Sequence, residues 1–213
     1  MNVHISVLPE IGKQIFTLNT GNLSEERKKL LQQLIDYVLE QLNNNRQVRL
    51  NFICTHNSRR SQFAQAWAKA LAAYFGIEIG AFSGGVEVTA FNPNAVEALK
   101  DSGFLILKQG KENPVYELKF SEELPPLKMF SKEFDDPANP DKGFAAVMTC
   151  SDADENCPLV PGAEKRIPLL YKDPKAFDGT ARQQEKYKER SVQIAAEMKY
   201  VFEKVQQQLS KRS

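Results

Sequence analysis

The sequence predicts an α/β fold, with an open, mainly parallel four-stranded sheet and helices on both faces. Apolar runs of strand length occupy residues 47–53 and 143–149, and the second run is continuous, which is typical of a strand covered on both faces. Segments with a helical pattern alternate with these strand-like segments. Strands that are joined through helices favour parallel order.

Composition limits the class of protein. The 213 residues include 28 basic and 27 acidic side chains and 42% hydrophobic residues, which fits one globular domain of ordinary size. The balanced charge gives no support to a nucleic-acid partner. No apolar run approaches the roughly 20 residues of a membrane span. We therefore expect a cytoplasmic protein with no nucleic-acid and no membrane partner.

The first predicted element is a helix that precedes the sheet. Residues 22–45 begin with the capping signal Ser24-Glu25-Glu26, and apolar side chains follow at helical intervals. Residues 1–46 are accordingly predicted to form a helical extension that packs on a domain of residues 47–213. This extension could cover a functional site or make a dimer contact.

The sheet is predicted to begin with a β-α-β-α unit. The strand of residues 47–53 leads through a loop into a helix of residues 61–75, which Gly76 ends. Residues 77–83 alternate as a second strand, and Pro93 suits the first turn of the helix after it.

The second half of the chain contains an insertion near residues 105–142. Within it, residues 115–120 and 127–131 alternate, which predicts a hairpin or two edge strands. After the continuous apolar run, residues 165–170 are predicted as the last strand of the sheet. A long C-terminal helix over residues 181–209 follows.

The turn after the first strand contains the candidate catalytic and anion-binding residues, Cys54-Thr55-His56-Asn57-Ser58-Arg59-Arg60-Ser61. Five residues between Cys54 and Arg60 can close a loop whose N–H groups point inward, at the positive end of a helix, where a tetrahedral oxyanion fits. The same field favours a thiolate, so we predict Cys54 as a nucleophile. Arg60 could donate to two oxygens of the anion, and Ser61 could cap the helix or donate to the sulfur. A buried cysteine before a helix that happens to begin with basic residues would have the same sequence.

Two further cysteines enclose a short acidic segment. Cys150 follows the continuous apolar strand and Cys157 lies seven residues later. An odd number of cysteines favours catalytic or redox thiols. Structural thiols or half a metal site are the alternatives, but zinc is poorly supported because His4 and His56 are the only histidines. We expect no metal and no cofactor.

Asp173-Pro174 follows the last predicted strand. A carboxylic acid at this position could protonate a leaving oxygen at the Cys54 loop, although a turn former or helix cap has the same sequence. The similar pair Asp136-Pro137 lies inside the insertion, where the order of elements does not direct it toward the loop. We therefore predict Asp173 as the general acid.

Together these residues resemble the thioredoxin-coupled arsenate reductases, which share their fold and anion loop with the low-molecular-weight protein tyrosine phosphatases. The resemblance covers roughly residues 48–204 apart from the insertion. Its parts are the Cys54 to Ser61 loop, Ser83-Gly84-Gly85 with Asn92-Pro93, the Cys150 to Cys157 segment, and Asp173-Pro174. It implies a low-molecular-weight phosphatase-like fold and an arsenate or phosphate oxyanion bound by residues 55–61.

The resemblance also implies a mechanism. Cys54 would attack arsenate while Asp173 protonates the departing oxygen, and Cys150 would then attack Cys54 and release arsenite. Cys157 would next attack Cys150, leaving a disulfide for thioredoxin, the implied reductant. The alternative is a phosphatase that acts on phosphotyrosine or small phosphoesters through a phosphocysteine, because that chemistry needs only Cys54, Arg60 and Asp173. A noncatalytic oxyanion-binding or redox-sensing module is a third hypothesis.

Two loop positions depart from the family pattern. His56 stands where the family usually has glycine, so a positive φ there would strain the histidine or change the shape of the loop. Arg59 adds a second positive charge beside Arg60, which either strengthens anion binding or faces solvent. We expect Arg59 to face solvent.

Overall fold

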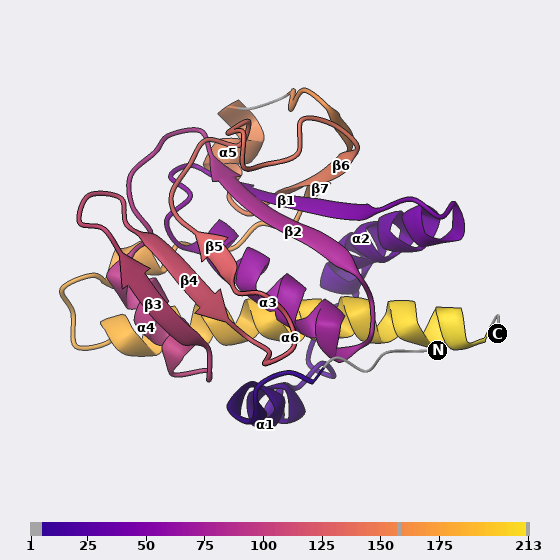
Figure 1. Cartoon of the computed structure of the whole chain (residues 1–213), viewed down its shortest axis with the longest axis horizontal. Coiled ribbons are helices and arrows are strands. Elements are labelled where there is room, and N and C mark those ends of the chain that lie inside the picture. Colours follow the sequence, from indigo (N-terminus) through magenta and orange to yellow (C-terminus); the bar gives the residue numbers. More distant parts are fainter. Residues whose placement is uncertain (1–5, 157–158, 212–213) are drawn as a thin grey trace.

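A four-stranded parallel sheet forms the centre of the computed structural model, which describes residues 6–156 and 159–211 (Figure 1). The strands run in the order β2-β1-β6-β7, and every neighbouring pair is parallel. This arrangement confirms the predicted fold class. The strands are β1 (Val48–Cys54), β2 (Ile79–Gly85), β6 (Phe144–Met148) and β7 (Ala163–Pro168).

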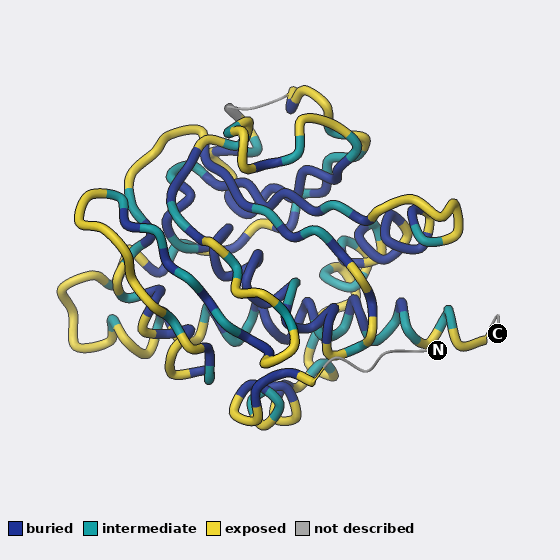
Figure 2. Tube along the Cα trace, in the orientation of Figure 1, coloured by how far each residue is buried: buried dark blue, intermediate teal, exposed yellow. Residues whose placement is uncertain are grey.

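Helices pack against one face of the sheet to form the main core. α2 (Glu25–Asn43) and α3 (Arg60–Tyr74) contact the sheet, and α6 (Gln183–Ser210) packs against both of them (Figure 1). Trp67 of α3 is fully buried, and its Nε1 donates to Ser191 Oγ of α6 at 2.9 Å. Figure 2 shows that β1, β6 and α3 are buried along most of their length. This rigid layer fixes the loop between β1 and α3.

The opposite face of the sheet has its own smaller apolar cluster. Alternate residues of the central strands, such as Ile53 and Met148, contribute to it, because side chains along a strand point to opposite faces. Ala153 of α5 (Ser151–Asn156) covers them. The sequence pattern did not predict α5, which is short and polar on its outer surface.

Two helices precede the sheet. The sequence predicted a helix within residues 22–45, and α2 occupies that stretch with Ser24 Oγ accepting from the N–H of Arg27 at 3.1 Å. α1 (Pro9–Thr17) was not predicted separately. It is held at both ends, since Leu8 N donates to Phe120 O at 2.9 Å and Lys199 Nζ donates to Ile15 O at 2.9 Å.

The segment after α4 (Pro93–Lys100) forms a separate three-stranded antiparallel sheet of order β3-β4-β5. Its strands are β3 (Leu105–Gln109), β4 (Val115–Lys119) and β5 (Leu127–Met129). The predicted hairpin is present as β4 and β5, which pair antiparallel, whereas the alternative of two edge strands does not hold because β4 is the central strand of this sheet. β3 was missed because Leu105 and Leu107 are 56% and 68% exposed, so the strand lacks the polar outer face that marks alternation.

No helix within residues 6–156 and 159–211 is long and apolar enough to span a membrane.

Candidate functional site

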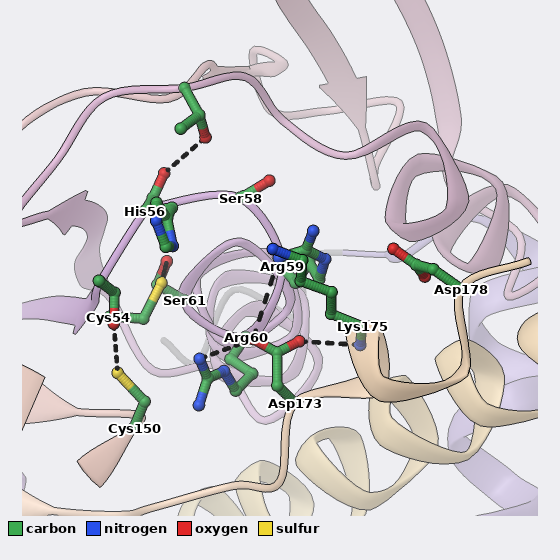
Figure 3. A network of polar contacts seen from close by, with 12 residues as sticks. Cys54, His56, Ser58, Arg59, Arg60, Ser61, Cys150, Asp173, Lys175 and Asp178 are labelled. Carbon is green, nitrogen blue, oxygen red and sulfur yellow. Dashed lines mark hydrogen bonds and ion pairs between the residues drawn. The ribbon is translucent and has the colours of Figure 1, made fainter. Parts of the chain in front are cut away.

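The Cys54 loop, residues 54–61, lies at the carboxyl end of the parallel sheet (Figure 3). Open α/β sheets carry their sites at this edge. Thr55 O accepts from the N–H groups of Val86 and Glu87, both at 2.8 Å. A Cβ atom built on Gly85 would lie 2.7 Å from Asn57 N, so only glycine allows β2 to approach the loop this closely.

Asn57 is the residue of the loop with a left-handed backbone, with φ of 45°. His56 does not have a positive φ, so the strain considered for the histidine does not arise. Asparagine tolerates this conformation, and here its side chain also braces the loop. Asn57 Nδ2 donates to Ser61 Oγ at 2.9 Å, while Oδ1 accepts from Gln62 Nε2 and Lys132 N at 3.1 Å each.

His56 is attached at both its backbone and its ring. Its carbonyl accepts from Ser131 Oγ at 2.9 Å, and its Nε2 lies 3.2 Å from Glu87 Oε2. The ring is partly exposed beside the loop. His56 therefore contributes a side chain to the surroundings of the loop at no conformational cost.

The Cys54 sulfur is buried, with 3% of the residue exposed, and lies 3.0 Å from Ser61 Oγ. Since Ser61 Oγ already accepts from Asn57, its own proton is free to point at the sulfur. This geometry matches the predicted donation from Ser61. A hydrogen bond of this kind stabilises a thiolate.

Arg60 has two protein partners at its terminal nitrogens. Nη1 donates to Tyr171 O at 3.2 Å. Nη2 donates to Asp173 Oδ2 at 2.8 Å (Figure 3). One hydrogen of each terminal nitrogen is therefore engaged with the protein. Arg60 Nε is buried and has no hydrogen-bond partner among the described residues. Its N–H and the second hydrogen of each terminal nitrogen are the donors left for a ligand.

Asp173 meets the loop through Arg60 and at the same time caps the short 3₁₀ helix η1 (Pro174–Phe177), because its Oδ1 accepts from Lys175 N at 3.0 Å. Asp173 can therefore be both a helix cap and a candidate general acid. Oδ1 makes the cap and orients the carboxylate, and Oδ2 lies at the loop. The order of the parallel strands brings Asp173 here, since it follows β7 at the same edge.

Arg59 does not face solvent, so that expectation is wrong. Its side chain is only 11% exposed, its Nε donates to Tyr187 OH at 2.9 Å, and its Nη1 lies 3.9 Å from Asp173 Oδ2. Tyr187 OH in turn donates to Asp178 Oδ1 at 2.8 Å, and burial raises the pKa of Tyr187. The sequence contains no signal for this contact, because α6 is more than a hundred residues further along the chain.

Cys150 is buried beside the loop, with its Sγ 3.4 Å from Thr55 Oγ1 (Figure 3). The N–H of Ala153 also approaches the Cys150 sulfur, at 3.4 Å. Cys54 and Cys150 are both free thiols. Cys157, the third predicted thiol, lies outside the described residues.

A groove of about 290 Å³ opens next to the loop. It is lined by His56, Ser58, Arg59, Thr89, Ala90, Asn92, Pro93 and Lys175. No aromatic and no acidic residue lines it in the part of the chain that the structure describes. The same part of the chain contains no group of three histidine, cysteine or acidic residues that could hold a metal ion.

Some supporting residues were not foreseen. Gln62 donates through Nε2 to Asn57 O and Phe130 O, both at 2.9 Å, and so joins the loop to the segment after β5. Its position directly after Ser61 was the available signal. Lys132 and Tyr171 contact the loop through backbone atoms, which no side-chain pattern reveals.

No family model matches the chain. Among curated proteins, it is 31% identical over 129 residues to an arsenate reductase of Bacillus licheniformis, covering 61% of this chain and 76% of that protein. It is 33% identical to an arsenate reductase of Bacillus subtilis with the same coverage.

The solved structures give a likeness of fold. A low-molecular-weight protein tyrosine phosphatase from T. tengcongensis has a TM-score of 0.50 and 20% identity, covering 74% of this chain and 99% of that one. A low-molecular-weight phosphotyrosine phosphatase from Vibrio cholerae O395 has a TM-score of 0.51 and 14% identity, covering 75% and 97%.

Proposed function

The chain belongs to the superfamily of the arsenate reductases and the low-molecular-weight protein tyrosine phosphatases, and from this premise we propose that it reduces arsenate. In this proposal Cys54 is the nucleophile, residues 55–61 hold the oxyanion, and Cys150 and Cys157 carry the electrons. Thioredoxin is the proposed reductant.

The observation that carries the proposal is the second thiol at the loop. Cys150 Sγ lies 3.4 Å from the hydroxyl of Thr55, the residue next to the nucleophile. Phosphoester hydrolysis requires only Cys54, Arg60 and Asp173, whereas a reductase needs a second thiol within reach of Cys54. The sequence relatives that are named arsenate reductases support the same choice.

The first step is an attack of the Cys54 thiolate on arsenic. A sulfur–arsenic bond forms, and one oxygen leaves as water after accepting a proton from Asp173 in its acid form. The free Nε–H of Arg60 and the backbone N–H groups of the loop would hold the remaining oxygens. Asp173 would release Arg60 Nη2 as the oxyanion enters.

The second step is thiol exchange. The Cys150 sulfur attacks the Cys54 sulfur, a disulfide bond forms, and the sulfur–arsenic bond breaks with its electron pair staying on arsenic. Arsenic(V) thereby becomes arsenic(III) and leaves as arsenite. Thr55 would orient the Cys150 sulfur through its hydroxyl. Cys157 would then displace Cys54 from the disulfide, and thioredoxin would reduce the Cys150–Cys157 bond.

The experiment that tests the proposal maps disulfides by mass spectrometry after the reduced protein has reacted with arsenate. We expect a Cys150–Cys157 disulfide in the wild type and an arrested Cys54–Cys150 disulfide in Cys157→Ser. The Cys54→Ser variant is the control, in which arsenate should produce neither bond. Thioredoxin-dependent arsenite release that survives Cys157→Ser would overturn the relay.

Phosphoester hydrolysis is the second candidate. It requires a nucleophile, an anion-binding arginine and an acid, and here Cys54 lies beside the Arg60–Asp173 pair. The groove beside the loop argues against a phosphotyrosine substrate, since no described residue that lines it is aromatic. Turnover of an aryl phosphate that is unaffected by Cys150→Ser would favour this candidate over reduction.

A further inference from the structure

The groove beside the Cys54 loop, with the lining residues given above, has a one-sided charge. Arg59 and Lys175 line it together with His56, and no acidic residue lines it in the described part of the chain. Figure 3 shows Lys175 extending from η1 toward Arg59 at the mouth of the loop. Two cations that share one small groove repel each other unless an anion lies between them.

The Arg59 guanidinium is oriented by Tyr187 and only partly balanced by Asp173, with which it forms a long ion pair. Its Nε is fixed by Tyr187 OH at 2.9 Å, and the nearest carboxylate oxygen to Nη1, Asp173 Oδ2, is 3.9 Å away. Neither terminal nitrogen of Arg59 makes a hydrogen bond to a described residue, although the side chain is 11% exposed. The terminal nitrogens are not fully buried, so their remaining N–H groups are accessible to a ligand in the groove that Arg59 lines.

Arg59 also lies next to the proposed oxyanion cradle. Asp173 Oδ2 lies 2.8 Å from Arg60 Nη2 and 3.9 Å from Arg59 Nη1, so the two guanidinium groups converge on one point. A ligand with two anionic groups separated by one or two atoms would contact both arginines. Ala90 and Pro93 leave only a small apolar wall for the rest of the ligand.

We propose that the groove is a second anion subsite, which binds a carboxylate or phosphoryl group attached to the oxyanion that the loop holds. The ligand class is therefore a small compound with two anionic groups, in addition to the inorganic oxyanion. Arg59 binds the second group through its terminal nitrogens, Lys175 supplies a second charge, and Tyr187 orients Arg59. This inference rests on the proposed function only in requiring that the loop binds an oxyanion.

The test compares phosphonoacetate with ethylphosphonate by isothermal titration of the reduced wild-type protein. The two probes have the same phosphonate and similar size, but only phosphonoacetate carries a carboxylate. We expect phosphonoacetate to bind about tenfold more tightly, the factor for one additional charge-assisted hydrogen bond. Lys175→Met and Arg59→Gln should each reduce this preference, and the double variant should bring it to within about twofold. Lys29→Met removes an exposed charge on α2 outside the groove and is the matched control, with the preference retained.

Equal binding of the two probes to the wild type would overturn the subsite, and so would a preference that persists in the double variant. Lys175 is exposed, so its variant keeps the test valid even if Arg59→Gln unfolds the protein. Failure of the proposed function is distinguishable, because the disulfide mapping reports arsenate reduction separately; if the loop binds no oxyanion at all, inorganic phosphate and ethylphosphonate would both fail to bind.

Discussion

Replacing Ser61 with alanine tests the polar support of the Cys54 sulfur. Ser61 Oγ lies 3.0 Å from the sulfur and accepts from Asn57 Nδ2 at 2.9 Å, which directs the hydroxyl proton at the sulfur. A hydrogen bond to a charged group contributes about 1.5–3 kcal/mol. Because Cys54 is buried, water does not readily replace the lost donor. We expect the rate at which the Cys54 sulfur is alkylated to fall about 10- to 100-fold.

The assay follows iodoacetamide alkylation of Cys54 at neutral pH by mass spectrometry, in a background with Cys150→Ser and Cys157→Ser. Ser58→Ala is the matched control, because it removes a hydroxyl from the same loop that donates to a backbone carbonyl at 2.6 Å and not to the sulfur. If Ser61→Ala alkylates as fast as Ser58→Ala, the hydroxyl does not stabilise the thiolate and the reasoning is refuted.

Three more predictions follow from other contacts. Thr55→Val removes the hydroxyl 3.4 Å from Cys150 Sγ and should slow arsenate-driven disulfide formation about tenfold in quenched-flow mapping; an unchanged rate would contradict the positioning role. Burial lowers the pKa of Lys132 to about 8 from its ordinary 10.5. The unfolded chain therefore binds more protons between these pH values, so the free energy of unfolding should rise with pH there by up to about 3 kcal/mol. Urea titrations should show that Lys132→Met loses this rise and is more stable than the wild type at pH 7. If the variant and the wild type show the same dependence of unfolding free energy on pH, the lowered pKa of Lys132 does not cause the rise. Glu197 is 1% exposed and accepts from Arg27 Nη2 at 2.7 Å, so Glu197→Ala should lower the free energy of unfolding by about 3–5 kcal/mol in urea. A loss below about 1 kcal/mol would show that the pair is not a buried one.

The fold class followed from the sequence because the pattern of a parallel sheet is local. A continuous apolar run such as β6 can only be covered on both faces, and helices between strands impose parallel order. The small antiparallel sheet was only partly predicted. β3 exposes two leucines, so burial in the folded chain and not alternation decides that it is a strand.

The candidate site divides in the same way. Cys54 and Arg60 are close in sequence, and Cys150 and Asp173 follow strands that end at the same edge, so chain order placed them at one edge of the sheet, and the tertiary structure decided their contacts. The disulfide mapping decides whether Cys150 acts as proposed. The role of Cys157 depends on that experiment as well.

The sequence by itself determined the four strands of the main sheet, their parallel order, the long helices and the residues that gather at one sheet edge, because periodicity and connection rules act over short stretches of chain. Only the tertiary structure decided that Asn57, not His56, takes the left-handed conformation, and that Arg59 turns toward Tyr187. These outcomes depend on contacts between residues far apart in the chain, such as the loop with Lys132 and with α6. Such contacts leave no periodic trace in the sequence.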